Sequence, residues 1–326
     1  MFLSFWVLIF LCLLMGFSTR VVLGAFDKMA VGMTTKGKIA AASILVALST
    51  SLPELFVTLA SVVEKKPEIA LGTLLGSNVA DLSIIIGGAT LLAGSLPIVG
   101  DYWRFELAAA FMAGISPILL MMDGGLSRMD GAILIVIYII YLSDLISDGK
   151  RKHLARTESA HGRILLRIGK KELINRGVPV IEMILGIIIL LVSGNWLVKI
   201  GAVMAAYWGV PVGVVGLLII SVGTSLPELF LSAGAIMKRN VALVFGNILG
   251  SVVTNATLII GVLAFFHPFS IERTGSYALV NIAFVVIFGL FWMFTSSKRK
   301  LERREGLILV GVFMTFVGLI LLFPSI

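Results

Sequence analysis

The stretch VALSTSLPELFVTLASVVEKKPEIALGTLLGSNVADLSIIIG, residues 46–87, occurs a second time as ISVGTSLPELFLSAGAIMKRNVALVFGNILGSVVTNATLIIG, residues 220–261. The two copies align without a gap at an offset of 174 and share 15 of 42 residues, including the block TSLPELF. Each copy is long enough to cross a membrane twice at about 20 residues per span. The chain is therefore expected to contain a duplicated pair of membrane helices.

The composition around the repeat is that of a membrane protein. Of the 326 residues, 59% are hydrophobic and 13% charged, against roughly 45–50% and about 25% in a soluble domain. One cysteine and three histidines exclude a disulfide framework and a zinc site built from Cys and His. Chemistry inside the membrane is therefore expected to use oxygen atoms.

Apolar runs of about 20 residues, bounded by charge, Gly or Pro, predict an all-α membrane protein with ten spans. We place the spans at residues 3–26, 37–63, 67–93, 101–122, 126–147, 178–207, 211–237, 241–266, 275–296 and 304–324. No positive charge precedes the first apolar run, unlike the start of a signal peptide, so this run is expected to remain as a span.

Lysine and arginine are unevenly distributed between alternate loops. Twenty of the 26 fall in one set of loops and four in the other, while Arg20 and Lys199 fall inside spans. The positive-inside rule places the basic set in the cytoplasm and both termini outside. Residues 148–177 then form a basic cytoplasmic linker between an N-terminal half, residues 1–147, and a C-terminal half, residues 178–326.

Each half contributes five spans, so the second copy of the repeat enters the membrane from the opposite side. Inverted repeats with helices broken near the midplane are the architecture of many secondary transporters. Pro53 and Pro227 predict such breaks, because proline has no N–H and its ring clashes with the carbonyl four residues earlier. The predicted fold is two inverted five-helix repeats with broken helices at the midplane.

Glycines predict where these helices approach partners closely. Gly72 and Gly76 are spaced by four residues, as are Gly246 and Gly250 in the second copy. Small residues at this spacing let helix backbones come together in membranes. Close approach of the third and eighth spans to neighbouring helices is therefore expected.

Three carboxylates, those of Glu54, Asp81 and Glu228, fall near the middle of predicted spans. Such a group costs roughly 2.5–3.5 kcal/mol to insert, so it is retained mainly where it faces a cavity or an ion path. Residues four apart share a helix face. The pairs with this spacing are Thr50 and Glu54, Ser77 and Asp81, Thr224 and Glu228, and Ser251 and Asn255. Hydroxyl, carboxylate and amide oxygens suit hard cations such as Ca²⁺ and Na⁺.

The paired blocks STSLPEL…GSNVAD and GTSLPEL…GSVVTN resemble the two alpha-repeats of the sodium/calcium exchanger family, of prokaryotic type, within the cation/calcium antiporter superfamily. With five spans in each half, the resemblance extends over essentially the whole chain. It implies that Glu54 and Glu228 are shared Ca²⁺ and Na⁺ ligands. The further ligands that it implies are the side chains of Thr50, Ser51, Ser77, Thr224, Ser225 and Ser251 and the carbonyls of Ala47, Thr50, Ser221 and Thr224.

Two positions depart from the pattern of that family. Ser49 replaces a usual Gly in the first block, which restricts the backbone at the break. The position four residues after the serine of the GS pair is Asp81 in the first copy and Asn255 in the second, the reverse of the arrangement in archaeal exchangers. Asp81 and Asn255 are both expected to be metal ligands. The site then has three carboxylates, as in those exchangers, but the third carboxylate lies in the first copy and not in the second.

The leading hypothesis is a secondary antiporter that exchanges Na⁺ for Ca²⁺ by alternating access in the plasma membrane of a prokaryote. It is expected to act as a monomer, with no cofactor, no nucleic-acid partner and no enzymatic activity. A proton-coupled or potassium-assisted cation exchanger is the alternative.

Three other classes have less support. A membrane enzyme with Glu54 and Glu228 as acid and base lacks a recognisable nucleophile with an oriented base. An ATP-driven pump lacks a phosphate-binding glycine loop. A channel needs one continuous path, whereas an inverted duplication favours two alternating ones.

Overall fold

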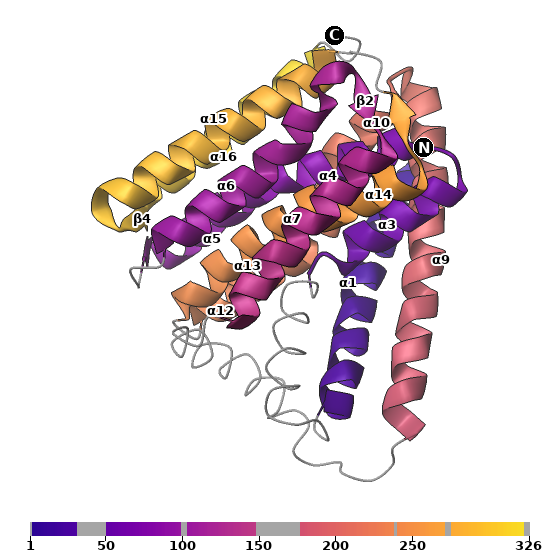
Figure 1. Cartoon of the computed structure of the whole chain (residues 1–326), viewed down its shortest axis with the longest axis horizontal. Helices are drawn as coiled ribbons and strands as arrows, with labels where there is room; N and C mark the ends of the chain where they lie inside the picture. Colours follow the sequence, from indigo (N-terminus) through magenta and orange to yellow (C-terminus); the bar gives the residue numbers. More distant parts are fainter. Residues whose placement is uncertain are drawn as a thin grey trace.

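The computed structural model describes residues 2–30, 50–98, 103–147, 177–237, 240–270 and 275–322, and these residues are mainly helical (Figure 1). The N-terminal half contains α1 (Phe2–Ala30), α3 (Leu52–Val63), α4 (Pro67–Ala80), the π-helical turn η1 (Asp81–Ile85), α5 (Ile86–Ala93), β1 (Ser95–Pro97), α6 (Trp103–Leu120), the 3₁₀ turn η2 (Met121–Asp123), β2 (Gly125–Leu126) and α7 (Arg128–Ser147).

The C-terminal half begins with the 32-residue helix α9, which packs along α1 (Figure 1). Its elements are α9 (Gly177–Trp208), α10 (Val212–Val215), the π-helical turn η4 (Gly216–Ile220), α11 (Ser221–Thr224), α12 (Leu226–Met237), α13 (Val241–Val253), the π-helical turn η5 (Thr254–Ile259), α14 (Ile260–Phe266), β3 (Phe269–Ser270), α15 (Gly275–Lys298), β4 (Lys300–Glu302) and α16 (Arg303–Leu322).

Eight helical stretches of the described residues are long and apolar enough to cross a membrane. They are Ser4–Ala25, Pro67–Ala93, Arg104–Asp123, Pro179–Trp208, Val212–Met237, Val241–Phe266, Tyr277–Lys298 and Arg303–Leu322. The two other predicted spans correspond to the shorter apolar helix α3 and to α7. Residues 37–49 and the linker up to residue 176 lie outside the described residues, so the count of ten spans stays a prediction.

The third and eighth predicted spans lie at the centre of the protein. Their most apolar parts, within Pro67–Ala93 and Val241–Phe266, are 94% and 83% buried, against 33% for Ser4–Ala25 and for Arg303–Leu322. Both central spans contain a π-helical turn at the same place in the repeat, with Asp81 in η1 and Asn255 in η5. The repeat therefore supplies the core.

The seventh predicted span is broken beside its proline. Helix α11 ends at Thr224, and α12 begins after Ser225, whose φ and ψ are −80° and 5°. In the first copy, α3 begins after Ser51, with nearly the same φ of −85° and ψ of 6°. Pro53 and Pro227 then lie in the first helical turn, where a missing N–H removes no hydrogen bond.

The glycines of the first copy permit the predicted close approach. A Cβ atom added at Gly72 would lie 2.2 Å from the carbonyl oxygen of Gly213, and one at Gly76 would lie 2.3 Å from that of Leu217. Helix α4 therefore packs directly on the backbone of α10 and η4. Among the described residues no atom lies within 4 Å of such a Cβ at Gly246 or Gly250, so the second approach stays a prediction.

Two short antiparallel strand pairs connect the two halves. Strand β1, which follows α5, pairs with β4, which precedes α16. Strand β3, which follows α14, pairs with β2, which precedes α7. The neighbouring helices pair between the two halves in the same way, because α5 packs on α16 and α14 packs on α7. Figure 1 shows β4 and β2 at opposite ends of the molecule.

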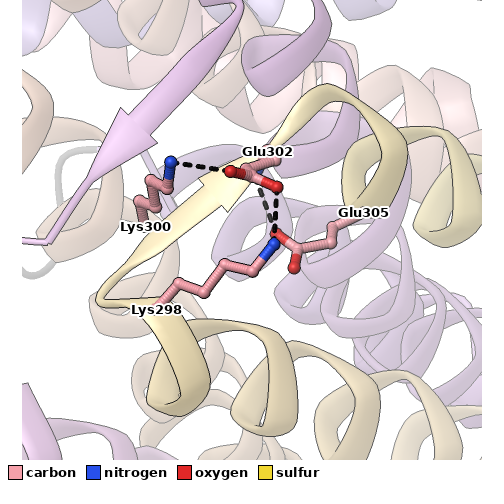
Figure 2. A network of polar contacts seen from close by, with 4 residues as sticks. All are labelled: Lys298, Lys300, Glu302 and Glu305. Atoms are coloured by element: carbon pink, nitrogen blue, oxygen red, sulfur yellow. Dashed lines mark hydrogen bonds and ion pairs between the residues drawn. The ribbon is translucent and has the colours of Figure 1, made fainter.

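A polar network stabilises the turn from α15 to α16 (Figure 2). Lys298 Nζ lies 2.9 Å from Glu302 Oε2, and Lys300 Nζ lies 2.7 Å from Glu302 Oε1. The backbone N–H of Glu302 donates to Glu305 Oε2 at 2.7 Å. Hydrogen bonds from Lys300 and Lys298 lower the pKa of Glu302 to about 2, so this carboxylate is charged at neutral pH.

Candidate cation-binding site

Each central helix places a serine against the glutamate of its own copy. Ser77 Oγ on α4 lies 3.4 Å from Glu54 Oε1 on α3. Ser251 Oγ on α13 lies 3.3 Å from Glu228 Oε1 on α12. All four side chains are at most 1% exposed. The duplicated blocks therefore form the same contact twice in the protein interior.

The threonines connect one copy to the other. Thr50 Oγ1 lies 2.9 Å from Ser251 Oγ, and Ser77 Oγ lies 3.4 Å from Thr224 Oγ1. Thr224 lies beside the Glu54 carboxyl, and Thr50 lies beside the Glu228 carboxyl. The residues implied as ligands thus converge from both halves on one region.

Oxygen atoms in this region exceed the protons that could satisfy them. The single proton of Ser77 has three acceptors in reach: Glu54 Oε1 at 3.4 Å, the carbonyl oxygen of Ser221 at 3.3 Å and Thr224 Oγ1 at 3.4 Å. A cluster of oxygens with too few protons is a favourable environment for a hard cation.

Several buried polar atoms have no hydrogen-bond partner among the described residues. Buried polar groups normally find such partners, so these atoms remain available to an ion or to water. They include Ser51 Oγ, Glu54 Oε2, both carboxylate oxygens of Asp81, Ser225 Oγ, Glu228 Oε2, and Oδ1 and Nδ2 of Asn255. These atoms are on residues of the predicted ligand set, and further buried atoms without a partner lie elsewhere in the described residues.

The three buried carboxyl groups interact electrostatically. Glu54 acts on Asp81, and both act on Glu228. Ser225 lies beside Asp81. The described residues nevertheless contain no group of three or more His, Cys, Asp or Glu side chains arranged to hold one metal ion. A cation bound here would therefore also need hydroxyl and carbonyl oxygens, and a cage shared by all three carboxylates stays a prediction.

The break does not free the carbonyl of Ser221. This carbonyl accepts the backbone N–H of Ser225 at 3.0 Å and the hydroxyl of Thr224 at 3.1 Å. Helical bonding continues as far as Ser225, because the backbone departs from the helix only at that residue. Ala47 and Ser49 lie outside the described residues.

Asn247, which is not among the ligands expected from the sequence, also belongs to this region. Its Oδ1 accepts the Thr50 hydroxyl at 3.0 Å, and it is 4% exposed. The residue lies four positions before Ser251 and eight before Asn255, on one face of the helix. This spacing is the sequence signal that identifies it.

Comparison with known proteins shows the family and the fold. The family model described as sodium/calcium exchanger protein matches residues 3–146 and 179–322. The chain belongs to the sodium/calcium exchanger protein family. Members of this family are transporters, and the chain is accordingly a cation/calcium exchanger with several membrane spans.

Three relatives match most of this exchanger. The putative antiporter CaxA of Alkalimonas amylolytica is 29% identical over 328 residues, covering 97% of this chain and 96% of the relative. The inner membrane protein YrbG of Escherichia coli is 27% identical over 281 residues, 85% of this chain and 84% of the relative. The sodium/calcium exchanger MaX1 of Methanosarcina acetivorans is 24% identical over 301 residues, 84% and 86% of the two chains.

Two solved structures share the fold of this exchanger. The sodium-calcium exchanger NCX_Mj superposes with a TM-score of 0.62 at 21% identity, covering 95% of this chain and 96% of that one. The H⁺/Ca²⁺ exchanger CAX superposes with a TM-score of 0.69 at 16% identity, covering 99% and 82%. The chain thus has the fold of both exchangers.

Proposed function

We propose that the chain is a secondary antiporter that exchanges Na⁺ for Ca²⁺ by alternating access, with Glu54 and Glu228 as shared ligands. The observation that carries this proposal is the duplicated contact of Ser77 with Glu54 and of Ser251 with Glu228. The threonine contacts between the copies support one binding region. Hydroxyl and carboxylate oxygens suit both ions.

Alternating access follows if the two halves are inverted repeats that exchange conformations. The exchanged strand pairs, β1 with β4 and β2 with β3, support this relationship. The nearly identical backbone angles at Ser51 and Ser225, each followed by a helix, support it further. On this proposal the basic linker of residues 148–177 is cytoplasmic, both termini are outside, and the membrane is the prokaryotic plasma membrane.

A proton-coupled or potassium-assisted exchange is the second candidate, and Asp81 is the observation that favours it. This side chain is 0% exposed, and neither carboxylate oxygen has a hydrogen-bond partner among the described residues. A buried carboxylate of this kind needs a cation or a proton to be stable. Asp81 could therefore bind a proton or K⁺ in addition to the ions that Glu54 and Glu228 bind.

One transport measurement separates the candidates. Proteoliposomes that contain the purified protein are loaded with Na⁺ or K⁺, or a proton gradient is imposed across them, and uptake of radioactive Ca²⁺ is followed. Uptake driven by outward Na⁺ alone supports Na⁺/Ca²⁺ exchange, while uptake that requires K⁺ or a pH gradient supports the second candidate. Protein that is folded but moves no Ca²⁺ under any gradient contradicts both.

A further inference from the structure

The side chain of Asn247 joins α13 of the C-terminal half to the residues just before α3 in the N-terminal half. Thr50 Oγ1 donates to Asn247 Oδ1 at 3.0 Å. Both residues are buried, at 4% and 5% exposure. Thr50 directly precedes Ser51, where α3 is capped. The amide oxygen of Asn247 is therefore held against the backbone segment that carries the predicted ligands.

This hydrogen bond decides where the single proton of Thr50 points. With that proton donated to Asn247, Thr50 Oγ1 presents only lone pairs to Ser251 Oγ, 2.9 Å away. Ser251 can donate its own proton to Glu228 Oε1 at 3.3 Å. Two hydroxyl oxygens then face each other with no proton between them. Such a pair is stabilised by a cation that lies against both.

On the side of the site formed by Thr224, Ser77 and Glu54, no equivalent side chain among the described residues orients the threonine. The residue equivalent to Asn247 in the first copy is Thr73, whose hydroxyl donates to the carbonyl of Ile69 in its own helix at 2.8 Å. Thr224, the equivalent of Thr50, donates to the carbonyl of Ser221 in its own helix at 3.1 Å. Thr224 is thus oriented by its own backbone, whereas Thr50 is oriented by a side chain from the opposite half.

We propose that Asn247 is a positioning residue that fixes the Thr50 hydroxyl for cation binding and so sets the affinity of the side of the site formed by Thr50, Ser251 and Glu228. The inference rests on the proposed function and deepens it. Asn247 acts through Thr50, because the Oδ1 atom that would otherwise be a ligand accepts the Thr50 proton.

The test compares three variants by Ca²⁺ uptake into proteoliposomes over a range of Ca²⁺ concentrations. Asn247→Thr introduces the residue that the first copy carries at this position, and a threonine there bonds its own helix as Thr73 does. We expect its KM for Ca²⁺ to rise about three- to tenfold, the equivalent of one oriented hydrogen bond, with Vmax within about twofold. Asn247→Asp keeps an acceptor oxygen of the same reach and adds a negative charge beside the cation region, so its KM should be no higher than that of the native protein.

Thr73→Val is the matched control, because it removes a hydroxyl that bonds only its own helix. Its KM should be unchanged. The proposal is wrong if Asn247→Thr lowers Vmax or thermal stability at unchanged KM, if Asn247→Asp is as weak as Asn247→Thr, or if Thr73→Val shifts KM equally.

Direct Ca²⁺ binding to purified protein keeps the test decisive if a variant transports poorly. Titration calorimetry should show the same three- to tenfold weakening for Asn247→Thr and no weakening for Asn247→Asp. Failure of the native protein to move Ca²⁺ contradicts the proposed function before any variant is compared, so the two failures are distinguishable.

Discussion

Thr50 and Ser251 lie 2.9 Å apart although 201 positions separate them in the chain. The first belongs to the N-terminal half and the second to the C-terminal half. An ion bound against both oxygens would hold the halves together, and any relative movement of the halves would change the distance between these ligands. On the proposed function, ion binding and movement are linked through this pair of hydroxyls.

Removal of either glutamate charge should abolish exchange. Glu54→Gln and Glu228→Gln keep the size of the side chain but lose the charge that compensates ion dehydration. We expect Ca²⁺ uptake to fall by at least about tenfold in each, a loss above roughly 1.4 kcal/mol in ion binding. Equal amounts of monodisperse protein in the membrane serve as the control, and uptake at the native rate would contradict the assignment.

We expect the carboxylate of Asp81 to function equally well when it is moved to position 255 in the second copy. Asp81→Asn should weaken cation binding, because it removes one of the three buried carboxylates. Adding Asn255→Asp returns the charge at the equivalent place in η5, and uptake should recover in the double variant. If the folded double variant stays as inactive as Asp81→Asn, Asp81 has a role specific to its own position.

Gly76 should not tolerate a methyl group. In Gly76→Ala the new Cβ would lie 2.3 Å from the carbonyl oxygen of Leu217, and such overpacking costs about 1–3 kcal/mol. Gly88→Ala is the control, because no described atom lies within 4 Å of the Cβ there. Thermal melting in detergent should show a clear loss for the first variant only. Similar melting temperatures would show that α4 can move away from η4.

The two strand pairs should face opposite sides of the membrane. In a Cys12→Ser background, a cysteine at Ser297, beside β4, should react with an impermeant thiol reagent only from the cytoplasmic side. A cysteine at Asp123, beside β2, should react only from outside. Both positions are exposed. Labelling of both from one side would overturn the predicted alternation of loops.

The contribution of Glu302 to the free energy of unfolding should be constant at neutral pH and should decrease only under acidic conditions. Its pKa is lowered to about 2 by Lys300 and Lys298, so its stabilising effect is present above the ordinary carboxyl pKa of about 4.3. The effect is lost as the pH falls toward 2. The difference in melting temperature between native protein and Glu302→Gln should be constant from pH 6 to 8 and smaller at pH 3. A difference that grows on acidification would contradict the role of this carboxylate.

Much of the framework could be predicted from the sequence, because the determinants are local. Proline at positions 53 and 227 predicts a break, and the structure has a break beside Pro227 and a helix start beside Pro53. Apolar length predicts the long helices in the same way. The strands of two or three residues could not be predicted, because their pairing depends on loops that tertiary packing brings together.

The site was predictable in composition and less so in its contacts. The repeated block identifies Glu54 and Glu228 and, four residues before each, Thr50 and Thr224, since residues four apart share a helix face. The contacts of Thr50 with Ser251 and Asn247 cross between the halves, so no spacing along one helix indicates them. The π-helical turns at Asp81 and Asn255 also depend on packing.

The helix starts after Ser51 and Ser225 have an electrical consequence. Each begins a 12-residue helix, and Glu54 and Glu228 lie in the first turn of these helices. The N-terminus of a helix carries about half a positive charge from its aligned peptide dipoles. Each glutamate therefore faces a fixed positive partner that stays in place when an ion leaves. On the proposed function, these helix starts lower the free-energy cost of the ion-free site and so make release of the transported ion easier.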